Sequence, residues 1–300
     1  ALSLIGLLDD NAHVSGSVKL NGEELIGKSD EEMSKIRGAR ISMIFQDPLS
    51  ALTPMFSIGD QLAEALLIHN PDMPKDEVRK RCIELLTLVG ITDPENRLDA
   101  YPHEFSGGMR QRVVIAIAIA NNPDIIIADE PTTALDVTIQ AQIIELMREM
   151  QKKNGNAIVM ITHDLGVVAD IADKIMVMYA GHPVEFGPAE EIFYNSTHPY
   201  TWGLIRSIPD PVMTEKYPLT PIKGNPPSLV RLPAGCAFSP RCPYATDKCR
   251  AERPGRIEVG PNHYSCCHYA LDKDFVAKNA PKTSRTKAAA PAQAEKGGEA

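Results

Sequence analysis

Two adjacent carboxylates carry the first chemical signal in the sequence. Asp129 and Glu130 directly follow a short apolar run at residues 124–128, which is typical of a buried parallel strand. Ligands of open α/β sheets bind at the carboxyl ends of the strands, and a buried acid without a partner is costly. Placed there, Asp129 can hold Mg²⁺ and Glu130 can polarise a water that attacks a γ-phosphate. The alternative is a carboxylate pair that caps the next helix.

Two further polar side chains are expected at the ends of other strands. His163 follows a predicted strand at residues 157–162, and Gln46 follows a β-rich run at residues 40–45. The histidine can donate to a phosphate oxygen, and the glutamine amide can reach a metal or the attacking water. Taken alone, a histidine is more often structural, and a glutamine is an ordinary surface residue.

A serine and two glycines form a candidate anion site. Ser106, Gly107 and Gly108 precede a predicted helix at residues 110–120. Their backbone N–H groups would lie at the positive end of the helix dipole, where anions bind. By itself, Ser-Gly-Gly is also found at ordinary helix starts.

The composition bounds the kind of protein. The chain has 300 residues, a formal net charge of −8, 43% hydrophobic residues and 23% charged residues, which excludes disorder of the whole chain and predicts roughly two domains. The longest apolar runs, such as residues 113–120, are far shorter than the ~18–20 residues of a membrane-spanning helix. The acidic balance gives no support to a protein that binds nucleic-acid phosphates.

Strand and helix patterns alternate, as in a doubly wound α/β domain. Apolar runs predict buried strands at residues 124–128, 157–162 and 174–179, and an amphipathic helix is predicted at residues 139–152. Residues 58–122 are expected to be helical. Within this region a helix is predicted at residues 76–89, and Gly90 ends it. Nearer the N-terminus, the sequence predicts a hairpin around Asn21-Gly22 and shows an apolar helical pattern at residues 1–8.

The C-terminal third has a different amino-acid composition. Prolines accumulate after residue 198, a cysteine-rich segment spans residues 236–268, and residues 273–300 have almost no apolar bulk. This last segment cannot offset its ordering entropy and is expected to be a disordered tail.

Six cysteines are present, and five of them lie between Cys236 and Cys267. The sixth, Cys82, falls in a helical pattern and is expected to be a buried small hydrophobe. Four thiolates in one compact segment indicate a metal or cluster site, and the alternatives are two disulfides or free thiols. Domains with the γ-phosphate chemistry expected above work in a reducing cytosol, which disfavours disulfides. Because the segment lacks a C-x₂₋₄-C pair, an iron–sulfur cluster is favoured over zinc.

In combination, the first set of motifs resembles the ATP-binding-cassette (ABC) ATPase family. Its Q-loop, signature motif, Walker B strand, D-loop and switch histidine are matched, in order, by Gln46, Ser106-Gly107-Gly108, Asp129-Glu130, Ala134-Leu135-Asp136 and His163. The signature reads F-S-G-G-M-R-Q-R, so Phe105 and Met109 depart from the commoner Leu and Gln. Neither residue supplies the anion-binding backbone.

The resemblance implies an α/β, P-loop NTPase-like core over residues 1–197, with a helical subdomain at about residues 50–122. It also implies that ATP and Mg²⁺ bind and that Glu130 and His163 are catalytic. The residues that it places against ATP or Mg²⁺ are Gln46, Asp129, Ser106, Gly107, Gly108 and Asp136.

The family's first motif, the P-loop G-x-x-x-x-G-K-[ST], is not found in its usual context. Residues 22–29 match the letters, but they lie in a charged hairpin arm where Glu23 and Glu24 would repel phosphates. In the family, the helix that matches residues 1–8 follows the P-loop. The chain is therefore expected to be truncated just after that motif and to bind ATP feebly on its own.

A second resemblance covers residues 198–272. The motifs that carry it are His198-Pro199-Tyr200-Thr201, Gly235-Cys236, Pro240-Arg241-Cys242-Pro243 and Cys267-His268-Tyr269. They look like the C-terminal extension of oligopeptide, dipeptide and nickel importer ATPases. In some members of that family the matching cysteines hold a [4Fe–4S] cluster, which here would be bound by Cys236, Cys242, Cys249 and Cys267, with Cys266 left over.

This resemblance implies a peripheral subunit on the cytoplasmic face of the inner membrane that hydrolyses ATP to drive peptide uptake. The implied partners are a second homologous ATPase, two transmembrane permeases and an extracytoplasmic binding protein, without nucleic acid. Dipeptides, longer peptides, nickel chelates and glutathione are alternative substrates.

One alternative function is a non-hydrolysing or truncated partner that only completes another subunit's ATP site. A DNA-repair-type ABC ATPase would need long coiled-coil heptads and a basic surface, which the sequence lacks.

Overall fold

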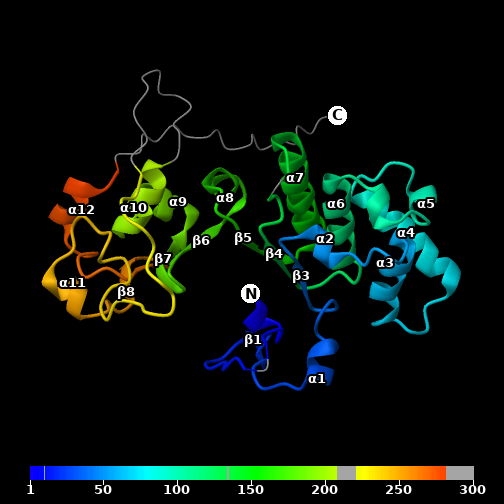
Figure 1. Cartoon of the computed structure of the whole chain (residues 1–300), viewed down its shortest axis with the longest axis horizontal. Coiled ribbons are helices and arrows are strands. Elements are labelled where there is room, and N and C mark those ends of the chain that lie inside the picture. Colours follow the sequence, from blue (N-terminus) through cyan, green and yellow to red (C-terminus); the bar gives the residue numbers. More distant parts are fainter. Residues whose placement is uncertain (10, 134, 208–220, 282–300) are drawn as a thin grey trace, which may run out of the picture. The chain divides into compact units, whose positions relative to one another are not determined.

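The computed structural model describes residues 1–9, 11–133, 135–207 and 221–281 (Figure 1). The chain divides into two compact units, Ala1–Asp164 and Leu165–Ala300. The first unit contains a parallel sheet and a helical subdomain, and the second contains an antiparallel sheet and the cysteine-rich segment. Within the described ranges, no helix has the length and hydrophobicity needed to cross a membrane.

Three parallel strands form the sheet of the first unit. They are β3 (Ile41–Ile44), β4 (Ile125–Asp129) and β5 (Ala157–Ile161), with β4 in the centre. Their register aligns Ile44 with Ala128 and Asp129 with Ile161, so the three carboxyl ends lie at one edge. The strands predicted from the three β-rich runs in this region are confirmed.

Both faces of β4 are covered, which explains its continuous apolar sequence. Ile126 and Ala128 pack into a core shared with the helical subdomain, whereas Ile127 packs into a second core with residues of the N-terminal arm. Because successive side chains point to opposite faces, one apolar strand supports two cores.

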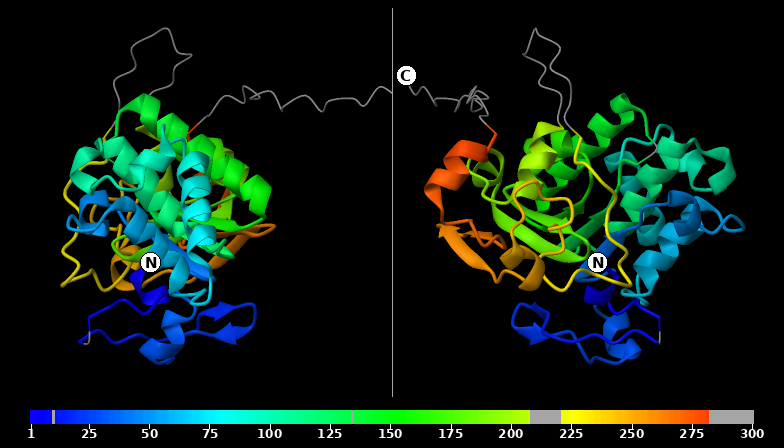
Figure 2. Two further views of the ribbon diagram at one scale, coloured as in Figure 1. Left: turned by 90° about the vertical axis from the view of Figure 1, so that its right-hand side faces the viewer. Right: turned by 60° about the vertical axis from the view of Figure 1, so that its left-hand side comes forward.

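The N-terminal arm consists of a hairpin and a short helix (Figure 2). Its elements are η1 (Leu2–Leu4), β1 (Lys19–Leu20), β2 (Glu23–Glu24) and α1 (Asp30–Ser34). The hairpin predicted at Asn21-Gly22 is confirmed, since both residues adopt the positive φ of a two-residue turn. The helix expected over residues 1–8 is wrong: only one 3₁₀ turn forms, because Gly6 has a φ of +64° and Leu7 and Leu8 are exposed.

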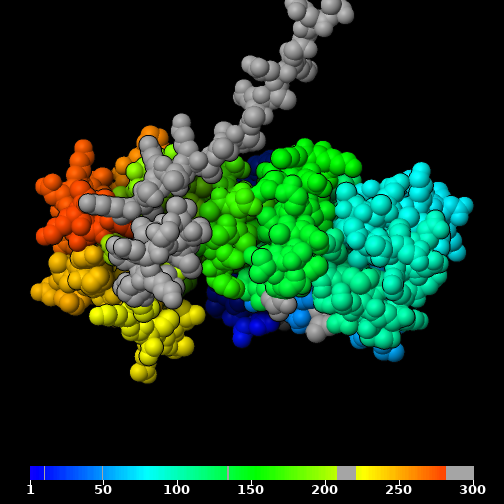
Figure 3. All heavy atoms as spheres, turned by 90° about the horizontal axis from the view of Figure 1, so that it is seen from above, coloured from blue at the N-terminus to red at the C-terminus, as the bar shows by residue number. Residues whose placement is uncertain are grey.

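The helical subdomain occupies the expected residues. Its elements are α2 (Pro48–Ala51), α3 (Ile58–Leu67), α4 (Lys75–Leu88), α5 (Pro94–Arg97), η2 (Pro102–Glu104) and α6 (Gly107–Ala118). As predicted, Gly90 follows the end of α4 with a φ of +73°, and Cys82 is buried. The long helix α7 (Val137–Asn154) shares the core of these helices, and Figure 1 shows it in green beside α6. In Figure 3 the bright green atoms lie directly against the teal atoms of the helical subdomain.

The sheet of the second unit is antiparallel, in the order β6-β7-β9-β8. Its strands are β6 (Lys174–Tyr179), β7 (His182–Pro188), β8 (Ile257–Gly260) and β9 (His263–Ser265). The apolar run at residues 174–179 was expected to form a strand of the parallel sheet. This prediction is wrong, because the run forms β6, which pairs antiparallel with β7. The cause is the tight connection through Ala180 and Gly181, whose φ values of 49° and 78° suit a two-residue hairpin.

The remaining helices of the second unit are α8 (Leu165–Ile171), α9 (Ala189–Tyr194), α10 (Pro199–Arg206), α11 (Asp247–Ala251) and α12 (Lys273–Asn279). The two compact units divide between residues 164 and 165, whereas the predicted domain boundary follows residue 197. The difference arises because β7 pairs with β9, which places residues before 197 in the same sheet as the cysteine-rich segment.

The tail predicted to be disordered from residue 273 begins with an ordered helix instead. Phe275 of α12 supplies the apolar anchor, with ring centroids 5.6 Å from Trp202 and 5.3 Å from Tyr244. The rest of that segment, residues 282–300, and the prolines at 209, 211 and 218 lie outside the described residues.

Truncation of a fully buried leucine in α4 tests the core of the helical subdomain. Leu85→Ala is expected to lower the free energy of unfolding by about 2–5 kcal/mol, because it removes buried methyl groups and leaves a cavity. Leu88→Ala in the same helix is the control, since Leu88 is 36% exposed and its truncation should cost under about 1 kcal/mol. Equal losses in urea denaturation of the two variants would contradict this packing.

Candidate functional site

Three of the predicted site residues meet at the carboxyl edge of the parallel sheet. The Nε2 of Gln46 donates to Oε2 of Glu130 at 2.9 Å, and Nδ1 of His163 lies 3.2 Å from Oε1 of Glu130. Each residue follows a different strand, and parallel pairing of these strands brings the residues together. We call this group, together with Thr133, the carboxylate cluster.

Thr133 is a member of the cluster that the sequence analysis missed. Its Oγ1 donates to Oε2 of Glu130 at 2.9 Å, so the carboxylate has three side-chain partners. Thr133 lies in the turn after β4, and a hydroxyl three residues after a carboxylate is the local signal that indicates such a contact.

The hydrogen bonds of the cluster set the charge state of Glu130. The Thr133 hydroxyl, followed by the His163 ring, holds the pKa of the Glu130 carboxyl below its usual value, so the carboxylate is ionised at neutral pH. An ionised carboxylate only accepts hydrogen bonds, and Nδ1 of His163 must therefore carry a proton. The cluster holds a negative charge in a defined orientation, as required to orient and polarise a water.

The backbone of Glu130 is strained. Its φ is +46°, in the left-handed region that residues with a side chain rarely adopt. Its N–H still donates to the carbonyl of Ile161 at 2.9 Å, so the hydrogen bonding between β4 and β5 ends only after this residue. Such strain persists where the surrounding contacts over-determine the conformation, and it concentrates at functional sites.

Asp129 is the last residue of β4 and is half-buried beside Glu130. Its carboxylate and the amide oxygen of Gln46 are the hard oxygen donors that Mg²⁺ takes. The described residues contain no group of three or more His, Cys, Asp or Glu side chains arranged to hold a metal. This donor set still fits Mg²⁺, which commonly uses one or two protein ligands and completes its shell with water and phosphate oxygens.

The signature residues form the start of α6. Ser106 is its N-cap, and the serine Oγ accepts a hydrogen bond from the N–H of Met109 at 3.3 Å. Gly107 is exposed, and a Cβ on it would meet no atom within 4 Å. The open approach leaves room for an anion close to the first N–H groups of this helix. Phe105, which departs from the family pattern, is buried.

Asp136 caps α7. Its Oδ1 accepts hydrogen bonds from the N–H groups of Thr138 and Ile139 at 3.1 and 3.0 Å. The capping role that the alternative interpretation gave to the Asp129-Glu130 pair is therefore performed by Asp136. Ala134 of the same motif lies outside the described residues.

The P-loop-like string at residues 22–29 has other local partners. The Nζ of Lys28 pairs with Oε1 of Glu23 at 2.8 Å, and Ser29 caps α1 in a reciprocal capping box with Glu32. The lysine and the hydroxyl that would serve a phosphate thus stabilise the hairpin arm and its helix.

In the second unit, four cysteines converge on one cavity. Cys236, Cys242, Cys249 and Cys267 line it together with His198, whereas Cys266 is not among its lining residues. All six cysteines are free thiols, so the two-disulfide alternative is wrong. Burial raises the pKa of Cys242 to about 11 and that of Cys267 to about 12, which keeps these thiols protonated unless a cation displaces the protons.

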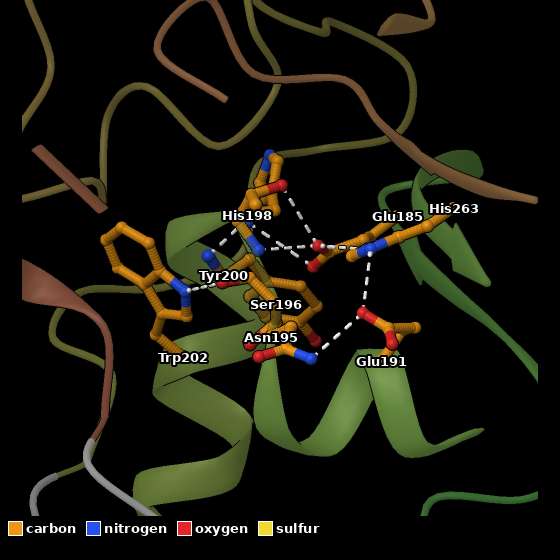
Figure 4. A network of polar contacts seen from close by, with 9 residues as sticks. Glu185, Glu191, Asn195, Ser196, His198, Tyr200, Trp202 and His263 are labelled. Carbon is orange, nitrogen blue, oxygen red and sulfur yellow. Dashed lines mark hydrogen bonds and ion pairs between the residues drawn. The ribbon is translucent and has the colours of Figure 1, made fainter. Parts of the chain in front are cut away.

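A buried carboxylate lies close to this cavity in the chain's second unit (Figure 4). Glu185 of β7 accepts hydrogen bonds from the N–H groups of Thr197 and His198 at 2.6 and 3.3 Å, and its Oε1 lies 3.1 Å from Nε2 of His263. These contacts join β7, β9 and the start of α10. Glu185 and His263 were not predicted from the sequence, because a glutamate in a short strand is usually exposed.

His198 is the neutral member of this network. Its Nδ1 accepts the N–H of Tyr200 at 3.1 Å, so the ring proton lies on Nε2. Complete burial lowers the pKa of His198 to about 4, and the ring stays uncharged at neutral pH. His198 thus caps α10 and lines the cysteine cavity without adding charge to it.

Two protein families match the chain. The family described as "ABC transporter" matches residues 3–133, and the family described as "Oligopeptide/dipeptide transporter, C-terminal region" matches residues 184–249. The oligopeptide transport ATP-binding protein OppD of Mycobacterium tuberculosis is 50% identical, over 89% of this chain and 44% of that protein. The dipeptide transport ATP-binding protein DppD of Escherichia coli is 49% identical, over 91% of this chain and 83% of that protein. The chain therefore spans less than half of the first relative and most of the second.

Two solved structures are similar to the chain. A dimeric post-hydrolysis state of the ATP-binding cassette MJ0796, bound to ADP and Pi, is 30% identical, with a TM-score of 0.54 over 58% of this chain and 74% of that one. The cbiO1 protein of Clostridium perfringens, part of the ABC transporter complex cbiONQ, is 32% identical, with a TM-score of 0.54 over 64% of this chain and 72% of that one. The expected ABC ATPase fold class is confirmed.

Acidification tests the buried histidine. Lowering the pH from about 7 to about 5 is expected to reduce the free energy of unfolding by about 2 kcal/mol, because the unfolded chain takes up a proton at His198 that the folded chain refuses. The folded pKa of about 4 lies below the usual 6.5, so this stability is present above about pH 6.5 and is lost as the pH falls toward 4.

The measurement is urea denaturation across this pH range. His198→Asn keeps an acceptor at the N-cap but cannot titrate, and it should flatten the pH dependence by the same amount. His13→Asn, at an exposed histidine, is the control and should leave the pH dependence as it is. An unchanged slope in the first variant would exclude His198 as the responsible group.

Proposed function

Because the chain belongs to the ABC-transporter ATP-binding proteins of the oligopeptide and dipeptide family, we propose that it is the ATP-hydrolysing, energy-coupling subunit of a membrane peptide importer. The observation that supports this most directly is the carboxylate cluster. An ionised Glu130, oriented by Gln46 and His163 at the carboxyl edge of a parallel sheet, is suited to activate water against a γ-phosphate.

In the proposed reaction, a water held by the Glu130 carboxylate gives a proton to that carboxylate as its oxygen attacks the γ-phosphorus of ATP. The bond to the β,γ-bridging oxygen breaks, and ADP and phosphate are the products. His163 is exposed over 77% of its side chain, so its Nδ1–H group can turn from Glu130 to a phosphate oxygen. Gln46 can exchange its contact with Glu130 for the water or the metal. Mg²⁺, held through Asp129, would neutralise charge on the phosphates.

We further propose that two such subunits act as a pair. The start of α6 exposes Ser106 and Gly107, so an anion supplied from outside the chain can approach the backbone there. The similar cassette bound to ADP and Pi is a dimer, which supports a pair in which each signature completes the other subunit's nucleotide site. Closure around ATP and reopening after hydrolysis would then supply the motion that drives transport.

The proposed membrane partners are two permeases, served by an extracytoplasmic binding protein. Met55 and Phe56, between α2 and α3, are 82% and 55% exposed, and exposed apolar residues of this size are typical of interaction surfaces. They follow Gln46 closely in the chain, so a permease helix docked on them would be close to the Q-loop. In this proposal the subunit lies at the cytoplasmic face of the inner membrane.

We also propose that the cysteine cavity holds a [4Fe–4S] cluster. The support is the donor set: Cys236, Cys242, Cys249 and Cys267 line one cavity, and four thiolates are the usual ligands of such a cluster. The described residues contain no group of three or more His, Cys, Asp or Glu side chains arranged to hold a metal, so the thiols must draw together when they bind. The raised pKa values of Cys242 and Cys267 mean that these two thiols release protons when they bind.

Chemical analysis of anaerobically purified protein tests the cluster. About four iron and four sulfide per chain are expected, with loss of both in Cys242→Ser. Cys82→Ser, at a buried cysteine of the helical subdomain, is the matched control and should retain them. Stoichiometric zinc in place of iron would refute the cluster.

Glu130→Gln tests the catalytic proposal. The variant keeps the size of the side chain but removes its charge, and phosphate release by the assembled importer should fall by about 100-fold or more, with ATP binding retained. Glu149→Gln, at an exposed position in α7, is the matched control and should be fully active. Retention of hydrolysis in the first variant would exclude Glu130 as the residue that activates water.

A further inference from the structure

Arg112 joins three helices of the first unit. It lies in α6, one turn beyond the signature residues, and is partly buried. Its Nη1 donates to the carbonyl of Val89 at the end of α4, and its Nη2 donates to Oε1 of Gln142 in α7 at 2.6 Å. Hydrogen bonds from a guanidinium are stronger than neutral ones, and the planar fork fixes the direction of both.

Two glycines make room for this arrangement. A Cβ on Gly90 would lie 2.7 Å from Nη1 of Arg112, and Gly90 also has a φ of +73°. A Cβ on Gly108 would lie 3.0 Å from Cγ2 of Ile139 in the first turn of α7. The start of α6 therefore meets α7 at two levels: Gly108 against Ile139, and Arg112 against Gln142.

In the proposed pair, α6 and α7 each begin beside residues that serve a different nucleotide site. α6 begins with the signature residues, which in the proposed pair serve the partner's nucleotide. α7 begins at its cap Asp136, six residues after Glu130, which serves the subunit's own nucleotide. A rigid joint between these helices would transmit a shift at one nucleotide site to the signature presented to the other.

We propose that Arg112 is a positioning residue that, through Gln142, holds the signature in a fixed relation to the D-loop and the catalytic strand of the same subunit. This inference rests on the proposed ATPase function. The contact with Val89 alone would anchor α6 within the helical subdomain, whereas the contact with Gln142 makes the link to α7.

The main test removes only the acceptor on α7. Gln142→Met in the assembled importer is expected to raise the KM for ATP by about threefold to tenfold, with kcat changed less than about twofold, because a displaced signature contacts ATP less well but leaves Glu130 in place. The unfolding midpoint should not change, since Gln142 is exposed. Gln151→Met, the same substitution later in α7, is the control and should match the parent protein.

A double-mutant cycle assigns the effect to the pair. Arg112→Met and Gln142→Met should each raise the KM, and the double variant should be no worse than Arg112→Met alone. Arg112→Lys should recover only part of the loss, because an ammonium cannot reproduce the two-pronged contact. Additive effects of the two single variants would overturn the proposal.

Hydrogen exchange on the chain itself separates this inference from the proposed function. Gln142→Met should speed amide exchange in residues 107–110 by at least about threefold, and Gln151→Met should not. Unchanged exchange together with an unchanged KM would refute the positioning role. Faster exchange in an importer that does not hydrolyse ATP would uphold the joint and refute the ATPase function.

Discussion

Parallel pairing of β3, β4 and β5 is the constraint on which the candidate active site depends. It carries three segments that are distant in the sequence to a single edge, where Glu130 leaves β4 with a left-handed backbone and an ionised carboxylate. A charge at such a position needs hydrogen-bond donors, and the ends of the two neighbouring strands supply Gln46 and His163. The apolar residues of β4 make this possible, because their burial on both faces holds the central strand between its two paired neighbours.

The same requirement is met differently in the second unit. Glu185 is satisfied by backbone N–H groups and by the buried His263, so none of its donors can move to a ligand without opening the core. The partners of Glu130 include an exposed histidine, which can exchange a carboxylate for phosphate or water at low cost. The arrangement around Glu130 is therefore suited to catalysis, whereas the arrangement around Glu185 stabilises the junction of β7, β9 and α10 beside the cysteine cavity.

Much of the fold follows from local pattern. The parallel strands, the helices of residues 58–122 and the hairpin at Asn21-Gly22 are all found where the residues predict them. The failures arise where a turn or a distant partner overrides the apolar pattern. The strand β6 has an apolar sequence that fits either sheet, and its tight turn into β7 decides for the antiparallel one. The helix α12 forms in a segment of low hydrophobicity because the ring of Phe275 packs against Trp202.

The sequence by itself determined which residues end strands and begin helices, and hence that Gln46, Glu130 and His163 would share an edge, because side-chain periodicity and strand ends are local properties. Only the tertiary structure decided that Glu185 is buried against His263, that His198 lines the cysteine cavity, and that Arg112 links α6 to α7. These contacts depend on distances and burial, which arise only when segments far apart in the chain are packed together.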